Sequence, residues 1–287
     1  MATFSAAGEI KSQWGEGPVW WGDTLYYVDI EGHLVIAWHP GSGTEKSWQV
    51  GERVGTVVPR QSGGLVIAGD NGFRFLDIES GELSFLSDPE SDKPDNRFND
   101  GKCDPSGRFW AGTMHLNKPR QPVAALYRLD ADHSKHKILS DITVSNGLVW
   151  NRAADTFFYI DTPTEQVVAF DYDSGSGNIS NKRLVVDTMD FKGVPDGMAI
   201  DENDNLWVAM CHGGVIRCFD SSNGQTLEVL ETPTLEVTAP AFGGADLSDL
   251  YVATGQSGIT EGDPLAGHLI FTEDASVKGV PSFSFAG

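Results

Sequence analysis

A strand-like stretch recurs about every 45 residues along this chain, and this period restricts the possible folds more than any other feature. The centres of successive stretches are separated by roughly 40, 44, 48, 49 and 44 residues. An alternating apolar and polar segment follows each stretch and ends in an Asp/Gly/Ser turn, which is the pattern of a β-hairpin. The recurring stretches are TLYYVDI (24–30), GLVIAGD (64–70), RFWAGTM (108–114), TFFYIDT (156–162), NLWVAMC (205–211) and DLYVATG (249–255).

Each repeat contains enough strand-like sequence for a four-stranded sheet. A third strand follows the turn at 81–87, 135–141, 178–187 and 225–231, and a short apolar run precedes the first stretch. Helical periodicity is almost absent. Six units of four strands at this period predict an all-β fold, a six-bladed β-propeller with four antiparallel strands per blade. We expect residues 1–287 to form this single domain.

Four repeats carry the same phrase, an oxygen-bearing residue followed by glycine, just before their first strand-like stretch. Equal phase within a repeat implies equal position in space, so these side chains should meet near the propeller axis. Carboxylates crowded at an axis repel one another, and a divalent cation with oxygen ligands relieves that repulsion. The six axis-facing positions are Glu16, Val54, Asp100 with Asn99 beside it, Asn146, Asp196 and Thr238.

Composition and charge exclude several classes of partner. The formal net charge is −21, from 41 acidic and 20 basic residues, which opposes binding to nucleic acid or an anionic membrane. No apolar run approaches the ~18 residues of a membrane span, and residues 1–13 lack the features of a signal peptide. Three cysteines without metal-type spacing suggest reduced, buried thiols. We therefore expect a cytoplasmic protein that acts on a small molecule.

The motifs around the axis-facing residues are more specific than the repeat itself. WGEGPVWWGDTLYYVDI, DNRFNDGKCDPSGRFWAGTM, VSNGLVW and PDGMAIDENDNLWVA resemble the regucalcin (senescence marker protein), gluconolactonase and luciferin-regenerating enzyme family essentially from end to end. The resemblance implies a six-bladed propeller and hydrolysis of sugar lactones. It also implies one divalent metal held by Glu16, Asn146 and Asp196, with substrate contacts from Arg97 and Asn99.

The chain departs from the family pattern after the AGTM motif. Asn117 stands where regucalcin-like members have a glutamate, which leaves the preferred lactone open. His115 follows the motif directly, as in some bacterial sugar lactonases, and can reach the pocket. We therefore include Asn117 and His115 among the expected substrate-binding residues.

These residue types suit lactone hydrolysis. A divalent cation can polarise the carbonyl, and Asp196 is the candidate general base for the attacking water. Arg97 can hold the ring oxygen or hydroxyl groups, and Asn99 can both donate and accept hydrogen bonds. Oxygen ligands favour Ca²⁺, with Mn²⁺, Zn²⁺ and Mg²⁺ also open. Asp100 either contacts the metal or orients its neighbours, and His212 either lines the pocket or lies in a turn.

Two other functions remain open at this point. The chain could be a calcium-binding regulatory protein without turnover, or a metal-dependent ester or organophosphate hydrolase on the same architecture. No GxSxG motif supports a serine hydrolase. Residues 171–180 and 201–206 begin like calcium-binding loops but do not complete the EF-hand pattern, so we expect turns there.

Overall fold

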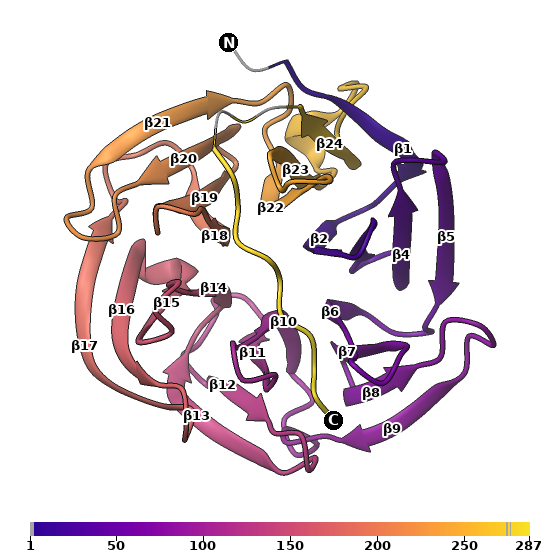
Figure 1. Cartoon of the computed structure of the whole chain (residues 1–287), viewed down its shortest axis with the longest axis vertical. Coiled ribbons are helices and arrows are strands. Elements are labelled where there is room, and N and C mark those ends of the chain that lie inside the picture. The colour runs from indigo at the N-terminus through magenta and orange to yellow at the C-terminus, as the bar shows by residue number, and fades with distance from the viewer. Residues whose placement is uncertain (1–2, 274, 276) are drawn as a thin grey trace.

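The computed structural model describes residues 3–273, 275 and 277–287, and these form six antiparallel sheets around a central axis (Figure 1). The predicted all-β six-bladed propeller is confirmed, and the two helical segments within the described ranges are single 3₁₀ turns, η1 (Thr162–Thr164) and η2 (Gly258–Thr260). Blade 1 contains β2 (Gly15–Trp21), β3 (Thr24–Asp29), β4 (Leu34–His39) and β5 (Thr44–Gln49). Blade 2 contains β6 (Val54–Pro59), β7 (Leu65–Gly69), β8 (Gly72–Leu76) and β9 (Leu83–Ser87). Blade 3 contains β10 (Asn96–Cys103), β11 (Phe109–His115), β12 (Ala124–Leu129) and β13 (Lys135–Ile142).

Blade 4 contains β14 (Ser145–Trp150), β15 (Thr156–Asp161), β16 (Gln166–Asp173) and β17 (Asn178–Asp187). Blade 5 contains β18 (Val194–Ile200), β19 (Leu206–Cys211), β20 (Val215–Phe219) and β21 (Thr226–Glu231). Blade 6 contains β22 (Val237–Gly243), β23 (Asp249–Thr254) and β24 (His268–Thr272), and its outer strand is β1 (Ser5–Lys11). The strands nearest the axis are β2, β6, β10, β14, β18 and β22, one from each blade.

The sixth blade differs from the expectation that every repeat supplies its own four strands. Its outer strand comes from the beginning of the chain, where β1 pairs antiparallel with β24 through Ser5 to Phe271 and its neighbours. Figure 1 shows the indigo N-terminal strand beside the yellow β24. Because this pairing joins the last blade to the start of the chain, it closes the ring.

All six innermost strands carry a register shift at the equivalent position. The shifts fall at Glu16/Val19, Val54/Thr56, Phe98/Gly101, Asn146/Leu148, Pro195/Met198 and Val237/Ala239. Such a bulge bends a strand and turns a side chain away from the normal alternation. The oxygen-bearing residue of the repeated phrase therefore lies within an inner strand, at its bulge, rather than in a turn before it.

Glycine follows that residue because the next blade lies too close for a side chain. A Cβ at Gly147 would stand 2.7 Å from the Asp196 carbonyl oxygen, and one at Gly197 would stand 2.3 Å from the Cβ of Ala239. Real Cβ atoms do not approach so closely. The glycines thus allow adjacent inner strands to pack around the axis, which brings the preceding residues of neighbouring blades together.

Apolar side chains fill the wedges between blades. Trp110 packs with Trp150 and Phe157 between blades 3 and 4, and Trp207 packs with Phe242 between blades 5 and 6. Trp110, Trp150 and Trp207 therefore fill the space between neighbouring blades. Each such ring buries a large apolar area, so these contacts stabilise the closed arrangement of blades.

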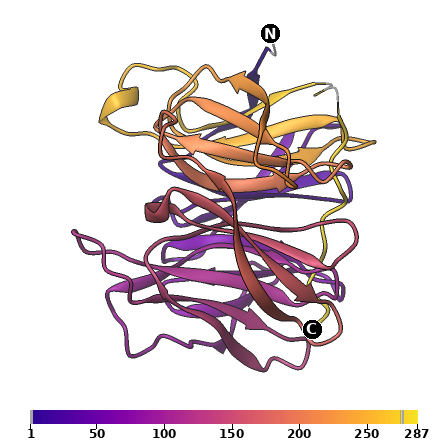
Figure 2. The same ribbon diagram turned by 90° about the vertical axis from the view of Figure 1, so that its left-hand side faces the viewer.

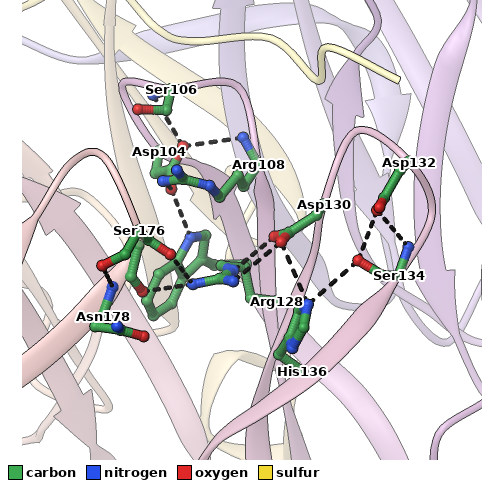
Figure 3. Close-up of polar contacts among 12 residues, drawn as sticks. Asp104, Ser106, Arg108, Arg128, Asp130, Asp132, Ser134, His136, Ser176 and Asn178 are labelled. Carbon is green, nitrogen blue, oxygen red and sulfur yellow. Dashed lines mark hydrogen bonds and ion pairs between the residues drawn. The ribbon is translucent and has the colours of Figure 1, made fainter.

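A polar network fixes the outer parts of blades 3 and 4 (Figure 3). The buried Asp104 accepts hydrogen bonds from the backbone of Ser106 and Arg108, and Arg108 Nη1 lies 3.1 Å from its second oxygen. Arg128 pairs with Asp130 and donates to the carbonyl of Ser176 in blade 4 at 2.9 Å. These charges are paired within the network.

The same arrangement recurs in blade 5 and accounts for the second calcium-like segment. Asp201 accepts hydrogen bonds from the backbone of Asn203 at 2.8 Å and of Asn205 at 2.9 Å, and from Trp207 Nε1 at 3.0 Å. Residues 201–206 therefore form a strand-connecting turn, as expected.

The two faces of the propeller are built differently. The C-terminal segment 277–287 crosses the face at which the inner strands end, as the yellow trace in Figure 1 and the right-hand edge of Figure 2 show. There the backbone of Phe285 pairs with Pro59 and Gln61, and residues 280–283 close an apolar cavity lined also by Val149, Trp150 and Ile200. Access to the axis is thus left to the opposite face. No helix in the described part of the chain has the length and apolarity to cross a membrane.

Candidate functional site

The repeated phrase places four polar side chains at the open end of the central channel. Glu16 on β2, Asp100 on β10, Asn146 on β14 and Asp196 on β18 are between 3% and 7% exposed, so all four are withdrawn from water. The charge of Asp100 acts on the carboxyl group of Asp196, and the charges of both aspartates act on that of Glu16, in each case raising the pKa. The structure therefore places the charged members near one another, and their role in binding a cation stays a prediction. Val54 and Thr238 occupy the equivalent bulge positions of blades 2 and 6 without a charge.

Burial and mutual repulsion make the ring costly to ionise. Burial, followed by the charges of Asp196 and Asp100, holds the pKa of Glu16 well above its ordinary value. Burial and Asp100 raise the pKa of Asp196 to about 8. Burial also raises the pKa of Asp100, although Lys102 acts in the opposite direction. Three carboxyl groups therefore share one poorly solvated space with too little positive charge to neutralise them.

Arg97 and Asn99 form the adjacent wall, one blade before Asn146. Arg97 Nη1 donates to Asn99 Oδ1 at 2.7 Å and to the Phe98 carbonyl at 2.8 Å. Asn99 Nδ2 in turn donates to the Ser145 carbonyl at 2.8 Å and to Asn146 Oδ1 at 3.3 Å. The chain of bonds fixes both side chains, so it orients polar atoms toward the ring before any ligand arrives.

The Arg97 guanidinium has unused hydrogen-bonding capacity. Its side chain is buried, it forms no ion pair with a carboxylate in the described ranges, and its Nε has no hydrogen-bond partner there. Burial lowers its pKa to about 10, which still leaves it charged at neutral pH. A buried cationic donor without a protein acceptor is costly, and an oxygen of a bound molecule would satisfy it.

Blade 4 supplies a second fixed amide. Asn146 Nδ2 donates to Thr162 Oγ1 at 2.9 Å, and that hydroxyl donates to the Pro195 carbonyl of blade 5 at 2.9 Å. These bonds determine the orientation of the amide and direct its oxygen toward Asn99 and the ring. Asn146 also lies against the Asp196 carboxylate and lowers its pKa.

The two remaining predicted substrate residues lie farther out. His115, at the end of β11 opposite Asn96 in the strand register, accepts a hydrogen bond at Nδ1 from the backbone of Gln121 at 3.0 Å. Asn117 is exposed in the loop 116–123, and its side chain makes no hydrogen bond to the ring within the described residues. His115 and the loop 116–123 border the open face. Their contact with substrate stays a prediction.

The sequence did not identify two neighbours of the ring. Lys102 is half-buried beside Asp100, and its ammonium donates to the Met198 carbonyl and partly offsets the carboxylate charge. Cys211, at the end of β19, lies against Asp196. All three cysteines are free and buried, as expected. Lys102 belongs to the RFNDGK motif, so its position in that motif was the available signal.

The donor set fits a hard divalent cation. The ring offers carboxylate and amide oxygens, and its carboxyl groups are buried and repel one another. A cation among them would offset both the burial and the repulsion that raise their pKa values. Glu16, Asn146 and Asp196 supply a formal charge of about −2, which a divalent ion balances. A neutral ligand oxygen can then approach without opposing charge.

Comparisons with known proteins place the chain in one family. Residues 14–256 match the family model described as the SMP-30/Gluconolactonase/LRE-like region. Regucalcin of Danio rerio is 40% identical over 284 residues, covering 96% of each chain. A Bacillus subtilis protein provisionally named a sugar lactone lactonase, YvrE, is 36% identical over 279 residues, covering 95% of each. The solved structure of a luciferin-regenerating enzyme superposes with a TM-score of 0.92 at 28% identity and full coverage of both chains.

Proposed function

Because the chain belongs to the SMP-30/gluconolactonase/LRE-like family, we propose that it is a metal-dependent lactonase that opens sugar lactones to aldonic acids. The single observation that carries this proposal is the position of Arg97 beside an oxygen-rich ring, held by hydrogen bonds through Nη1 while its buried Nε has no partner within the described residues. A site that only stored a cation would have no use for the buried Arg97 with its unpartnered Nε. A lactone offers a carbonyl, a ring oxygen and hydroxyl groups, which are the acceptors that this wall lacks.

In the proposed reaction, Glu16, Asn146 and Asp196 hold one divalent cation, for which Ca²⁺ best matches the oxygen donors. When bound, the cation polarises the lactone carbonyl and stabilises the negative charge that develops on its oxygen. Asp196 accepts the proton of the attacking water at a carboxylate oxygen. Its pKa of about 8 in the ion-free protein reflects the same burial that excludes competing bulk water.

The donor wall binds and orients the substrate. Arg97 donates to the ring oxygen or a hydroxyl group of the sugar, and Asn99 donates to and accepts from a neighbouring hydroxyl. Since Arg97 and Asn99 already hydrogen-bond each other, little side-chain freedom is lost on binding. His115 at the end of β11 and Asn117 in the loop 116–123, both at the open face, discriminate between lactones.

Acid release from lactones tests the proposal directly. Chelator-stripped protein would be supplied separately with Ca²⁺, Mn²⁺, Zn²⁺ or Mg²⁺ and mixed with D-glucono-1,5-lactone or five-carbon aldonolactones, and the pH followed. We expect cation-dependent acid release above the spontaneous rate. The Asp196→Ala variant should give none.

A matched variant separates chemistry from general damage. Asp130→Ala removes an aspartate from the outer network of blade 3, away from the ring, and should retain turnover. Absence of turnover with every cation and lactone, in protein that binds a cation tightly, would contradict the lactonase proposal. It would favour a cation-binding protein without catalysis.

A further inference from the structure

A second cluster of ligating side chains lies beside the ring, where blades 5 and 6 meet. Cys211 ends β19, His212 follows it directly, and Glu236 immediately precedes β22. One sulfur, one ring nitrogen and one carboxylate oxygen from these residues all lie within 4.8 Å of one another. The cluster thus combines three different donor types from two blades, unlike the oxygen-only ring.

The distances within the cluster are short. His212 Nδ1 lies 2.5 Å from Glu236 Oε2, Cys211 Sγ lies 3.7 Å from the same oxygen, and the sulfur and the nitrogen are 4.0 Å apart. Ligands at about 2.0–2.3 Å from a tetrahedral ion stand about 3.3–3.7 Å from one another. Small side-chain movements would therefore bring all three atoms to ligand positions.

Burial and charge also favour a cation here. The Glu236 side chain is 1% exposed, and within the described ranges its one ion-pair partner is His212. Its other oxygen accepts a hydrogen bond from the Ser257 hydroxyl, which fixes the orientation of the carboxylate. A buried carboxylate beside a buried thiol is costly unless positive charge compensates it. The His212 side chain is 53% exposed, so an ion can enter from solvent.

We propose that Cys211, His212 and Glu236 form a second metal site, selective for a borderline-soft divalent cation of the Zn²⁺ class. Thiolate, imidazole and carboxylate are the donors that such ions take, whereas Ca²⁺ and Mg²⁺ prefer oxygen alone. On binding, the thiol proton passes to solvent and the sulfur–metal bond replaces it. Three protein ligands leave a fourth position for water.

The second site and the ring are neighbours, but they differ in their donor atoms and therefore in the cations that they prefer. Cys211 lies against Asp196 on one side and Glu236 on the other, so its sulfur stands at the wall between the two sites. An ion bound to it would connect the end of β19 to the start of β22. This would join blades 5 and 6 at the open face.

Cobalt spectroscopy tests the assignment without reference to turnover. Reduced, chelator-stripped protein would be titrated with Co²⁺ under nitrogen. A thiolate ligand produces a sulfur-to-cobalt charge-transfer absorption in the near ultraviolet, and oxygen ligands do not. Because the ring also takes a divalent cation, we expect this absorption to saturate by two equivalents of Co²⁺, with an intensity that corresponds to one thiolate-bound ion per chain. It should disappear when Zn²⁺ is added.

Variants identify the ligands. Cys211→Ser should abolish the absorption, and His212→Ala, which changes an exposed side chain, should weaken Co²⁺ binding at least tenfold. Cys218→Ser removes another buried thiol and should leave the absorption intact, as should Glu16→Gln in the ring. Absence of the absorption at saturating Co²⁺, its survival in Cys211→Ser, or unchanged affinity in His212→Ala would overturn the proposal.

Discussion

Neutralising Asp196 should stabilise the ion-free protein while removing its response to divalent cations. The carboxyl group is 7% exposed, and burial together with Asp100 raises its pKa from 3.8 to about 8. At pH 7 the unfolded chain ionises this group, whereas the ion-free folded chain keeps it protonated. At about 1.4 kcal/mol per pKa unit, over the roughly 3 units that separate 3.8 from pH 7, the group costs the ion-free folded state about 4 kcal/mol.

The Asp196→Asn substitution removes this cost and keeps the shape of the side chain. The new amide must find hydrogen-bond partners in the same buried space, which costs about 1–3 kcal/mol where it fails. The net gain is then about 1–3 kcal/mol, or about 2–10 °C in Tm for a domain of this size.

Scanning calorimetry at neutral pH, with chelator and then with millimolar Ca²⁺, measures both effects. Wild-type protein should gain stability from Ca²⁺, as expected for a ligand that binds only the folded state. Asp196→Asn should start from a higher Tm, gain almost nothing from Ca²⁺ and show no lactone turnover. A variant that melts below wild type without the ion, or that gains as much from Ca²⁺, would refute the reasoning.

The buried Asp104 provides a matched control with the opposite sign. It is 0% exposed, like the ring residues, but its carboxylate is paired with Arg108 and accepts hydrogen bonds from Trp110 and Tyr172. Asp104→Asn should therefore lower Tm and preserve the gain from Ca²⁺. Equal effects of the two substitutions would show that the sign does not depend on the charge surrounding the carboxylate.

Four further predictions follow from the same structure. Arg97→Ala should raise KM about 10- to 100-fold, since a charge-assisted hydrogen bond contributes about 1.5–3 kcal/mol; steady-state kinetics and a cation titration check this, and loss of cation binding would contradict the substrate role. Glu16→Ala should weaken cation affinity in a calorimetric titration, with turnover partly restored by excess cation. Because the folded pKa values of Glu16 and Asp196 are raised, the stability of ion-free protein should fall as the pH rises from about 5 to about 8, in melting curves taken with chelator; a rise over that interval would be inconsistent with the raised values. Deleting the strand residues 5–11 removes β1 from blade 6 and should lower Tm in a calorimetric melting curve, and an unchanged Tm would contradict its role in closing the ring.

The repeat predicted most of the fold because position within a blade is a property of sequence phase. Residues at equal phase, such as Glu16 and Asn146, occupy equal places at the bulges of their inner strands, so the ring followed from alignment of the repeats. The closure of blade 6 could not be predicted in this way, because β1 and β24 are distant in sequence and neither segment carries a pattern that identifies the other as its pairing partner. A pattern within one repeat cannot reveal a strand borrowed from the other end.

The same reasoning explains what was missed at the site. Cys211 is the last residue of the second strand of blade 5, and Glu236 precedes the inner strand of blade 6. The two residues therefore occupy different positions within their repeats and belong to no common motif. Their proximity arises from the packing of neighbouring blades. The orientation of Arg97 likewise depends on its bond to Asn99, which spacing alone does not determine.

The borrowed strand of blade 6 also sets the timing of folding during synthesis. Residues 5–11 leave the ribosome before the other strands of the propeller, yet their partner β24 begins at His268. At about 5–20 residues per second, the N-terminal strand waits about 13–50 s before its partner exists. During that interval the nascent chain can complete blades 1 to 5 but cannot close the ring. The ring of blades can therefore close only after β24 of blade 6 has been synthesised.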